Sequence, residues 1–320
     1  MRVLITGAAG FIGSHFIKYF VEKYPKWEII ILEGLNYAGT YDRLKDFRGK
    51  LKIFHHAFRG VINDYLVKNI GELDYIFHIG AETHVDRSLV EPLPFLQSNI
   101  IGTYNLLEYA RFHQPRLKMF FYISTDEVYG PAELGVDHDE DQPHRPSNPY
   151  SATKAAAEDL VYCWNRSMGI PAIITNTMNN IGEMQHTEKY VPKIIRCLMN
   201  GDIITVHGSP DQPGSRKYLY ARDHADAIDF LITNGKQGEK YNIVGEEEIN
   251  NLELVNKINK ILNKTPKIKF VDFHSTRPGH DLRYSLDGAK MEKLGWTPPT
   301  NVDKALEQMV DWTLKNKEWL

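Results

Sequence analysis

The sequence RVLITGAAGFIG, at residues 2–13, holds the pattern that decides the fold. A short apolar run that ends in a glycine-rich turn is typical of a buried strand leading into a helix, and residues 14–24 carry apolar side chains at helical spacing. Backbone N–H groups at such a turn and the positive end of the helix dipole bind a diphosphate. We therefore predict that Gly7, Gly10 and Gly13 form a dinucleotide-binding turn.

The same alternation of strand and helix continues along the chain. Apolar runs predict strands at 28–32, 51–55, 74–78, 119–123 and 170–175, and helical periodicity predicts helices at 61–70, 93–112 and 150–168. This order predicts an α/β fold with a Rossmann-like, doubly wound parallel sheet. The alternation fades after residue 175. We predict a cofactor domain at 1–175 and a smaller α/β substrate domain at 176–320, with a segment at about 218–234 returning to the first.

Glu33 ends the second predicted strand, about twenty residues after the glycine turn. A carboxylate at this place binds the hydroxyl groups of the adenosine ribose, and its charge repels a 2′-phosphate. Glu33 therefore favours NAD over NADP. The alternative is a solvated carboxylate at a strand end.

Two motifs predict an acid–base centre. Thr125, Asp126 and Glu127 follow the strand at 119–123, and open α/β sheets place their ligands at this end of a strand. Tyr150 and Lys154 stand four apart on a predicted helix and so share one face. The Lys154 charge is expected to lower the pKa of the Tyr150 phenol, which would make it a general base. We further expect one of the two adjacent carboxyls to have a raised pKa, leaving one acid and one base.

The composition excludes several other classes of protein. The chain has 38 Lys and Arg against 41 Asp and Glu, which argues against a nucleic-acid or membrane-surface partner. Its two cysteines lack the spacing of a metal site, so no metal is expected. The sequence begins on a strand with no apolar leader segment, and we expect a cytoplasmic protein.

Further motifs occur in the order that one known family shows. The run TDEVYG at 125–130, PYSATKA at 149–155, NN at 179–180, EKYVP at 188–192, LYARDHADA at 219–227 and RPGHDLRY at 277–284 accompany the glycine turn. Over residues 2–296 the chain resembles an extended short-chain dehydrogenase/reductase of the nucleotide-sugar 4,6-dehydratase type. The Asp and Glu after the Thr distinguish it from related sugar epimerases.

The resemblance implies an NAD-dependent hydro-lyase that makes a 4-keto-6-deoxy sugar nucleotide, with dTDP-glucose or UDP-glucose favoured as substrate. It implies that Tyr150 takes the proton of the sugar 4-hydroxyl while Thr125 holds the 4-oxygen. Lys154 would hold the nicotinamide ribose, Glu127 would remove the C5 proton, and protonated Asp126 would donate to the departing 6-hydroxyl. The remaining implied contacts are the cofactor residues Gly7, Gly10, Phe11, Ile12, Gly13, Ala81 and Thr83 and the substrate residues His84, Asn179, Arg216 and Arg277.

The resemblance also implies a homodimer that pairs the helices at 93–112 and 150–168. Some positions depart from the family pattern. Ala57 stands where an Asp usually contacts adenine, and Ile181-Gly-Glu183 and Glu247 differ from the usual residues near the nucleotide. The identity of the base therefore stays open. The alternatives are an epimerase or decarboxylase on the same scaffold, or a silent NAD-binding module, which would have no use for a complete acid–base set.

Overall fold

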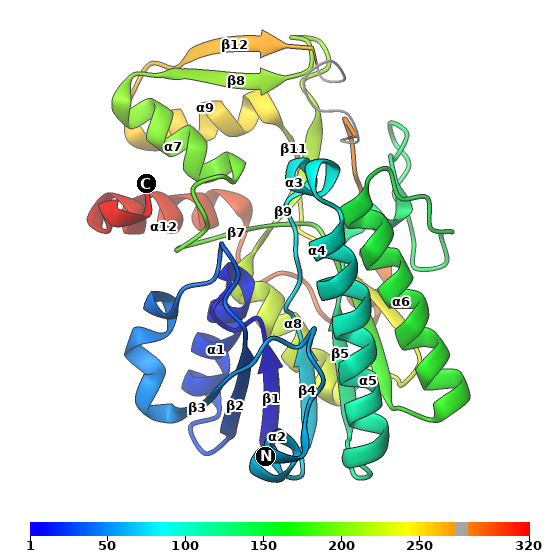
Figure 1. The fold of residues 1–320 in the computed structure, drawn as a ribbon. Coiled ribbons are helices and arrows are strands. Elements are labelled where there is room, and N and C mark those ends of the chain that lie inside the picture. The colour runs from blue at the N-terminus through cyan, green and yellow to red at the C-terminus, as the bar shows by residue number, and fades with distance from the viewer. Residues whose placement is uncertain (273–280) are drawn as a thin grey trace.

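The large sheet of the protein is parallel throughout and positions the site. A computed structural model describes residues 1–272 and 281–320, and in it seven strands have the order β10-β6-β5-β4-β1-β2-β3 (Figure 1). The strands are β1 (Arg2–Thr6), β2 (Glu28–Glu33), β3 (Leu51–His55), β4 (Tyr75–His78), β5 (Met119–Ile123), β6 (Ala172–Thr177) and β10 (Lys240–Ile243). The predicted doubly wound α/β fold is confirmed.

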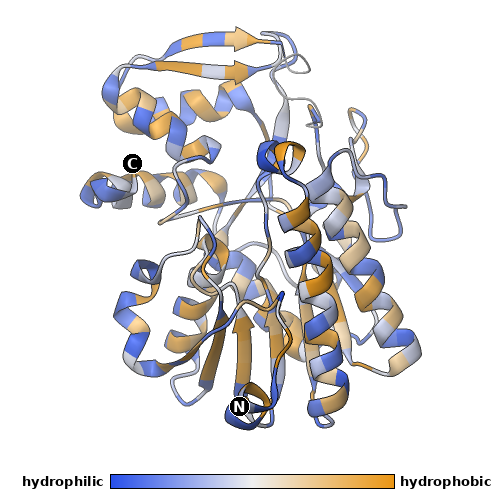
Figure 2. Ribbon diagram, in the orientation of Figure 1, coloured by the Kyte–Doolittle hydropathy of each residue, from blue (hydrophilic) through white to orange (hydrophobic). Residues whose placement is uncertain are grey.

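Alternation along the strands supplies a core on each face of the sheet, because successive side chains point to opposite faces. Val3 and Ile5 pack with α1 (Phe11–Lys23) and α8 (Ala221–Asn234). Leu4 packs in a second cluster, which includes residues of α2 (Asp64–Ile70), α5 (Gly102–His113) and α6 (Pro149–Met168). Figure 2 shows these strands as mostly hydrophobic, as expected for a sheet covered on both faces.

The chain after β6 builds two small sheets and then returns to the large one. One sheet has the order β11-β9-β7 and the other pairs β12 with β8. These strands are β7 (Asn179–Ile181), β8 (Ile203–His207), β9 (Ser215–Tyr220), β11 (Glu248–Asn250) and β12 (Lys267–Val271); α7 (Tyr190–Asn200), α9 (Asn251–Leu262) and α12 (Val302–Lys315) pack beside them. Strand β10 pairs in parallel with β6, and α8 packs against α1.

One predicted helix differs in detail from the structure. The helix expected at 93–112 is divided into α4 (Leu93–Phe95), a π-helical stretch η2 (Leu96–Ile101) and α5. Arg216 lies in β9, which pairs with both β11 and β7. The C-terminal helix ends at Lys315 and is followed by the short η4 (Lys317–Trp319). The other short elements are η1 (Tyr41–Lys50), α3 (Val85–Val90), η3 (Asp126–Tyr129) and α11 (Ala289–Leu294).

The glycine turn packs too closely for side chains. Gly7 has a φ of +69°, and a Cβ there would lie 2.5 Å from the Gly80 Cα. A Cβ at Gly13 would lie 2.1 Å from the Gly7 carbonyl oxygen. These contacts bring α1 directly onto the end of β1 and point the first N–H groups of the helix at the edge of the sheet where ligands bind.

Replacement of Gly13 by Ala is expected to destabilise the protein by about 2 kcal/mol, because the added methyl group overlaps backbone that cannot move independently. Urea unfolding at neutral pH measures this loss. Gly49→Ala is the matched control, since nothing lies within 4 Å of a Cβ at that position. Equal stability of the two variants would contradict the close approach.

Candidate active site

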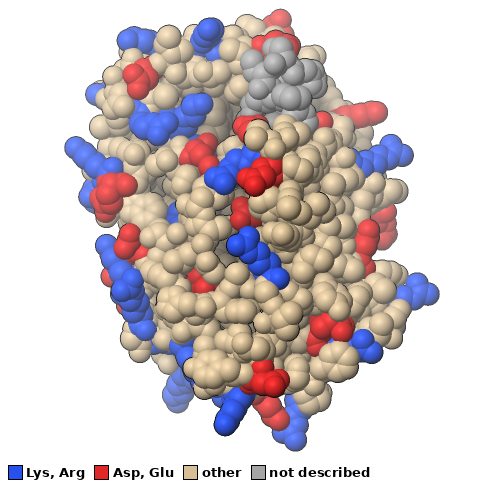
Figure 3. Space-filling model, viewed as in Figure 1, with Lys and Arg blue, Asp and Glu red and all other residues tan. Residues whose placement is uncertain are grey.

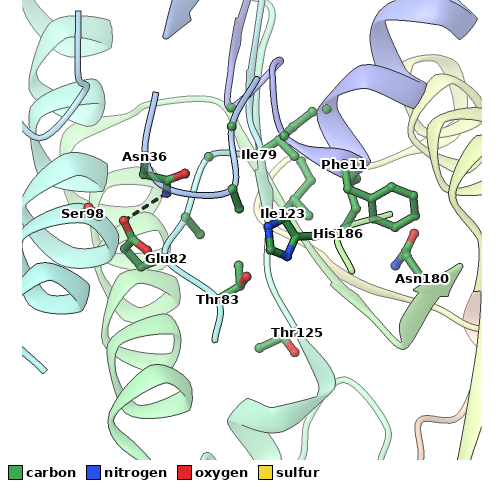
Figure 4. A pocket seen from close by; sticks show the side chains of 18 of the residues that line it. Phe11, Asn36, Ile79, Glu82, Thr83, Ser98, Ile123, Thr125, Asn180 and His186 are labelled. Atoms are coloured by element: carbon green, nitrogen blue, oxygen red, sulfur yellow. Dashed lines mark hydrogen bonds between the residues drawn. The ribbon is translucent and has the colours of Figure 1, made fainter. Parts of the chain in front are cut away.

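One pocket of about 340 Å³ lies at the carboxyl ends of the large sheet. It brings together most of the residues that the sequence singles out (Figure 4). The predicted residues that line it are Gly7, Gly10, Phe11, Ile12, Gly13, Glu33, Ala81, Thr83, Thr125, Asp126, Glu127, Tyr150, Lys154 and Asn179. The glycine turn and the Thr-Asp-Glu and Tyr-Lys motifs, far apart in sequence, therefore share one cavity.

Glu33 braces the glycine turn from inside this pocket. Its Oε2 accepts a hydrogen bond from the Ala9 N–H at 2.9 Å, and its Oε1 accepts one from the Leu35 N–H at 3.0 Å. A carboxylate oxygen has two acceptor positions, so each oxygen retains one for another donor. The carboxylate thus has a structural role in addition to the predicted ribose contact.

Two links across the pocket were not predicted from the sequence. Asn36 Nδ2 donates to Glu82 Oε1 at 3.0 Å, as the dashed line in Figure 4 shows. The Tyr37 hydroxyl donates to Glu188 Oε1 at 2.9 Å. All four residues line the pocket. The second link joins the loop after β2 to the segment before α7, and no local pattern marks such a contact between distant loops.

The catalytic candidates Thr125, Asp126 and Glu127 lie where β5 ends. The Thr125 hydroxyl donates to Asp126 Oδ1 at 2.9 Å and accepts a long hydrogen bond, 3.4 Å, from the Glu127 N–H. Asn148 caps the N-terminus of α6 through Ser151, and its Nδ2 donates to Glu127 Oε2 at 3.2 Å. Asn148 is a site residue that the sequence reasoning missed. Its position just before Pro149, typical of an N-cap, was the available signal.

Burial raises the pKa of both carboxyls. The pKa of Asp126 is raised to about 6 by burial, and Arg216 and Thr125 act in the opposite direction. The pKa of Glu127 is raised to about 7 by burial and, second, by the charge of Asp126. The predicted like-charge effect is therefore confirmed at Glu127. Both carboxyls are thus shifted toward the neutral form, as an acid–base pair at neutral pH requires.

The expected effect of Lys154 on Tyr150 is wrong for this structure. Burial, followed by the charge of Glu127, raises the pKa of the Tyr150 phenol well above its ordinary value. Lys154 Nζ instead donates to the Ile123 carbonyl at 2.7 Å and lies 4.2 Å from the centre of the Tyr122 ring. Burial lowers the pKa of Lys154 to about 7. The spacing of four residues along the helix carries both side chains into the pocket. The pKa of Tyr150, however, depends on burial and on the charges of the carboxylates.

The three other predicted substrate residues lie outside the pocket lining or outside the described part of the chain. His84 caps α3, its Nδ1 accepting from the Arg87 N–H at 3.3 Å. The Arg216 guanidinium donates to the carbonyl oxygens of Ser215, Leu282 and Asp281 and lies 4.5 Å from the centre of the Tyr284 ring. Its charge still lowers the pKa of Asp126 and Glu127. Arg277 lies outside the described residues.

Ala57, which stands where the family usually has an Asp, lines the pocket together with Phe58. The Phe58 ring lies edge-on to His78, with ring centres 5.1 Å apart. It also occupies the space beside Gly80 and Gly102, where a Cβ would approach it within 2.5 and 2.4 Å. This wall of the pocket is therefore aromatic.

Comparisons with known proteins agree with this geometry. The sequence profile of the GDP-mannose 4,6 dehydratase family matches residues 4–309. The dTDP-glucose 4,6-dehydratase of Mycolicibacterium smegmatis is 38% identical, over 100% of this chain and 95% of that protein. A dTDP-glucose 4,6-dehydratase of Escherichia coli is 37% identical, over the same shares. The structure of DesIV, a dTDP-glucose 4,6-dehydratase from Streptomyces venezuelae with NAD bound, superimposes with a TM-score of 0.92 at 34% identity and covers 100% of this chain and 98% of that chain.

The parallel sheet, the glycine turn and the shared pocket, together with these likenesses, define an extended short-chain dehydrogenase/reductase. Within that class the chain belongs to the GDP-mannose 4,6 dehydratase family. It is a nucleotide-sugar 4,6-dehydratase, a hydro-lyase. Among the described residues no helix is long and apolar enough to cross a membrane, and none of their His, Cys, Asp and Glu side chains form a group of three or more suited to a metal ion.

The raised pKa of Glu127 predicts that this residue lowers stability as the pH rises. Unfolded Glu loses its proton near pH ~4, whereas the folded carboxyl keeps it up to about pH 7. Between these values the folded state binds more protons, so the free energy of unfolding falls with increasing pH. Glu127→Gln is therefore expected to stabilise the cofactor-free protein by about 2 kcal/mol at pH ~8 and to have little effect at pH ~4.

Urea unfolding of both proteins at the two pH values measures this difference. Glu133→Gln is the control, because Glu133 is an exposed acid close by in the chain. A Glu127→Gln effect that is the same at both pH values would contradict the raised pKa.

Proposed function

We propose that the chain dehydrates dTDP-glucose to its 4-keto-6-deoxy product, with NAD as a bound cofactor. One observation carries the proposal: two carboxyls, the buried Asp126 and the half-buried Glu127, lie in the same pocket as Tyr150 and Lys154. Removal of water across C5 and C6 needs one group that accepts a proton and another that donates one. Relatives that are 37–38% identical bear the name of this activity.

The residues present fit NAD. Gly7 and Gly13 leave space in which a side chain would collide, so backbone N–H groups can approach a diphosphate. Glu33 keeps acceptor positions for ribose hydroxyls, and Ala81 and Thr83 line the same cavity. When bound, NAD supplies an acceptor and a donor of hydride.

The chain's own residues move the protons. Between about pH 6 and 7 the carboxyl pair holds one proton, so one member can donate while the other accepts. We propose that Glu127 removes the sugar C5 proton and later returns it, that Asp126 protonates the departing 6-hydroxyl, and that Tyr150 accepts the 4-hydroxyl proton. In this scheme the shared proton resides on Asp126 when the C5 proton is removed. Thr125 touches both Asp126 and Tyr150 and is suited to hold the 4-oxygen.

The substrate proposal is tested by incubating the purified protein with dTDP-glucose, UDP-glucose, GDP-mannose and CDP-glucose in parallel. Mass spectrometry is expected to show loss of one water from dTDP-glucose, and in D₂O one deuterium at C5 of the product. Loss of water from only one of the other nucleotide sugars would show that this sugar, and not dTDP-glucose, is the substrate. Epimerisation or loss of CO₂ without dehydration would overturn the activity.

Asp126→Asn and Glu127→Gln separate the two proton transfers. Each is expected to slow product formation by roughly 10²–10⁴, because each removes one general acid–base contact. Only Glu127→Gln should also abolish deuterium exchange at C5 of the substrate. Glu133→Gln, an exposed acid of the same type, should leave both rates unchanged. An unaffected Asp126→Asn enzyme would favour epimerase chemistry.

We also propose that the protein is a cytoplasmic homodimer. Exposed apolar side chains gather along the predicted interface: Leu93, Leu96, Ile101, Tyr104 and Tyr162. The surface over α4 and α5 is mostly without charged side chains in Figure 3. Such a patch on a soluble protein marks an interaction site. A reducing compartment suits Cys163 and Cys197, which are both free thiols.

Leu96→Glu is expected to convert the dimer into a monomer, since it would place a charge in an apolar interface. Light scattering during gel filtration measures the mass. Val61→Glu is the control, because Val61 is a more exposed apolar side chain on another part of the surface. A mass of one chain for the parent protein would contradict the proposal directly.

A further inference from the structure

Glu158 is a buried carboxylate directly behind the catalytic turn. Only 1% of the residue is exposed, and it stands one helical turn after Lys154 on α6. Its Oε1 accepts a hydrogen bond from Asn176 Nδ2 at 2.7 Å. Its Oε2 lies 2.8 Å from Lys240 Nζ and 3.2 Å from His144 Nε2. The reaction as described above assigns no task to this charge.

Asn176 connects Glu158 to a catalytic residue. The same Nδ2 that reaches Glu158 also lies 3.0 Å from the Thr125 carbonyl oxygen. Its Oδ1 accepts a long hydrogen bond, 3.4 Å, from the Tyr129 hydroxyl, and Asn176 itself is fully buried. Hydrogen bonds therefore fix both the oxygen and the nitrogen of the Asn176 amide. Through this amide, Glu158 holds the Thr125 carbonyl in place.

Lys154 connects Glu158 to the other half of the site. Residues four apart on a helix are neighbours on its surface. Lys154 is buried, and its described hydrogen bond is to a neutral carbonyl, that of Ile123. Burial lowers the pKa of Lys154 to about 7, and the charge of Glu158 raises it. Glu158 thus supplies the anionic neighbour that opposes deprotonation of the ammonium.

We propose that Glu158 is a positioning residue of the dehydration centre: its carboxylate holds Asn176 against the Thr125 carbonyl and keeps the Lys154 ammonium charged. The inference rests on the proposed function in one respect: the reaction that Thr125 and Lys154 serve is taken to be the proposed dehydration. Glu158 itself does not line the pocket. It therefore acts through its two neighbours.

The other groups that face Glu158 come from several elements. Lys240 belongs to β10, His144 to the loop before α6, Tyr122 to β5 and Tyr129 to η3. The Lys240 and His144 side chains are 20% and 19% exposed, so solvent reaches both. Together they hold the pKa of Glu158 at about 2, against the effect of burial. Because Lys240 remains accessible to water, replacement of Glu158 by Gln leaves no buried ammonium without a partner at that position.

The decisive experiment is Glu158→Gln in the holoenzyme. Gln can keep an oxygen for Asn176; it removes the charge and places an NH2 group where the second carboxylate oxygen stood. The ¹³Cε signal of Lys154 in lysine-labelled protein, assigned from its loss in Lys154→Met, is expected to titrate about one pH unit lower than in the parent. The alkaline limb of the kcat profile should move in the same direction. Asp159→Asn is the matched control, because Asp159 is the next residue on α6 and its side chain is 74% exposed.

An unchanged Lys154 titration in Glu158→Gln would overturn the proposal, even if the melting temperature fell. Should that variant not fold, Glu158→Asp keeps the charge but draws back from Asn176. Its Lys154 titration should match the parent while kcat falls by roughly 10- to 100-fold. A parental kcat in Glu158→Asp would equally overturn it. The titration needs no turnover, so its outcome is independent of whether dTDP-glucose is the substrate.

Discussion

The buried hydrogen bond from Lys154 Nζ to the Ile123 carbonyl joins helix α6 to the end of strand β5. Both catalytic motifs depend on this contact, because Tyr150 is carried by α6 and Thr125 follows β5 directly. A buried ammonium without such an acceptor would be costly. Ile123 is the last residue of β5 and has no partner on β4, because the ladder between these two strands ends at His78 and Tyr122. The end of one strand thus fixes the place of the reaction.

Burial around this contact shifts the pKa values of four neighbouring groups. The same low-polarity surroundings raise the pKa of Asp126 and Glu127, lower that of Lys154 and raise that of the Tyr150 phenol. In each case the neutral form is favoured, because burial penalises charge of either sign. Burial therefore disfavours the charged form of each of these four groups, and at Lys154 the charge of Glu158 acts against that effect.

The sequence could predict the large sheet and most of the pocket, because both follow from local patterns. The apolar runs mark buried strands, and parallel strands gather the residues after Ile123 and the glycine turn at one edge. That Tyr150 and Lys154 share one face of a helix also followed from their spacing of four residues. By contrast, two hydrogen bonds join segments that share no sequence pattern: that of Tyr37 with Glu188 and that of Asn176 with Glu158. Contacts of this kind depend on how loops and helices meet in space.

Charge was the least predictable property of the site. Spacing alone placed a cation beside Tyr150, yet the larger influences on its pKa are burial and Glu127. The same holds for the carboxyl pair, where the like charge of Asp126 does raise the pKa of Glu127 but burial is the larger cause at both residues. A pKa sums desolvation with every neighbouring charge, so it requires the three-dimensional surroundings. Glu158 illustrates the consequence, since its effect on Lys154 operates from behind the pocket that the motifs define.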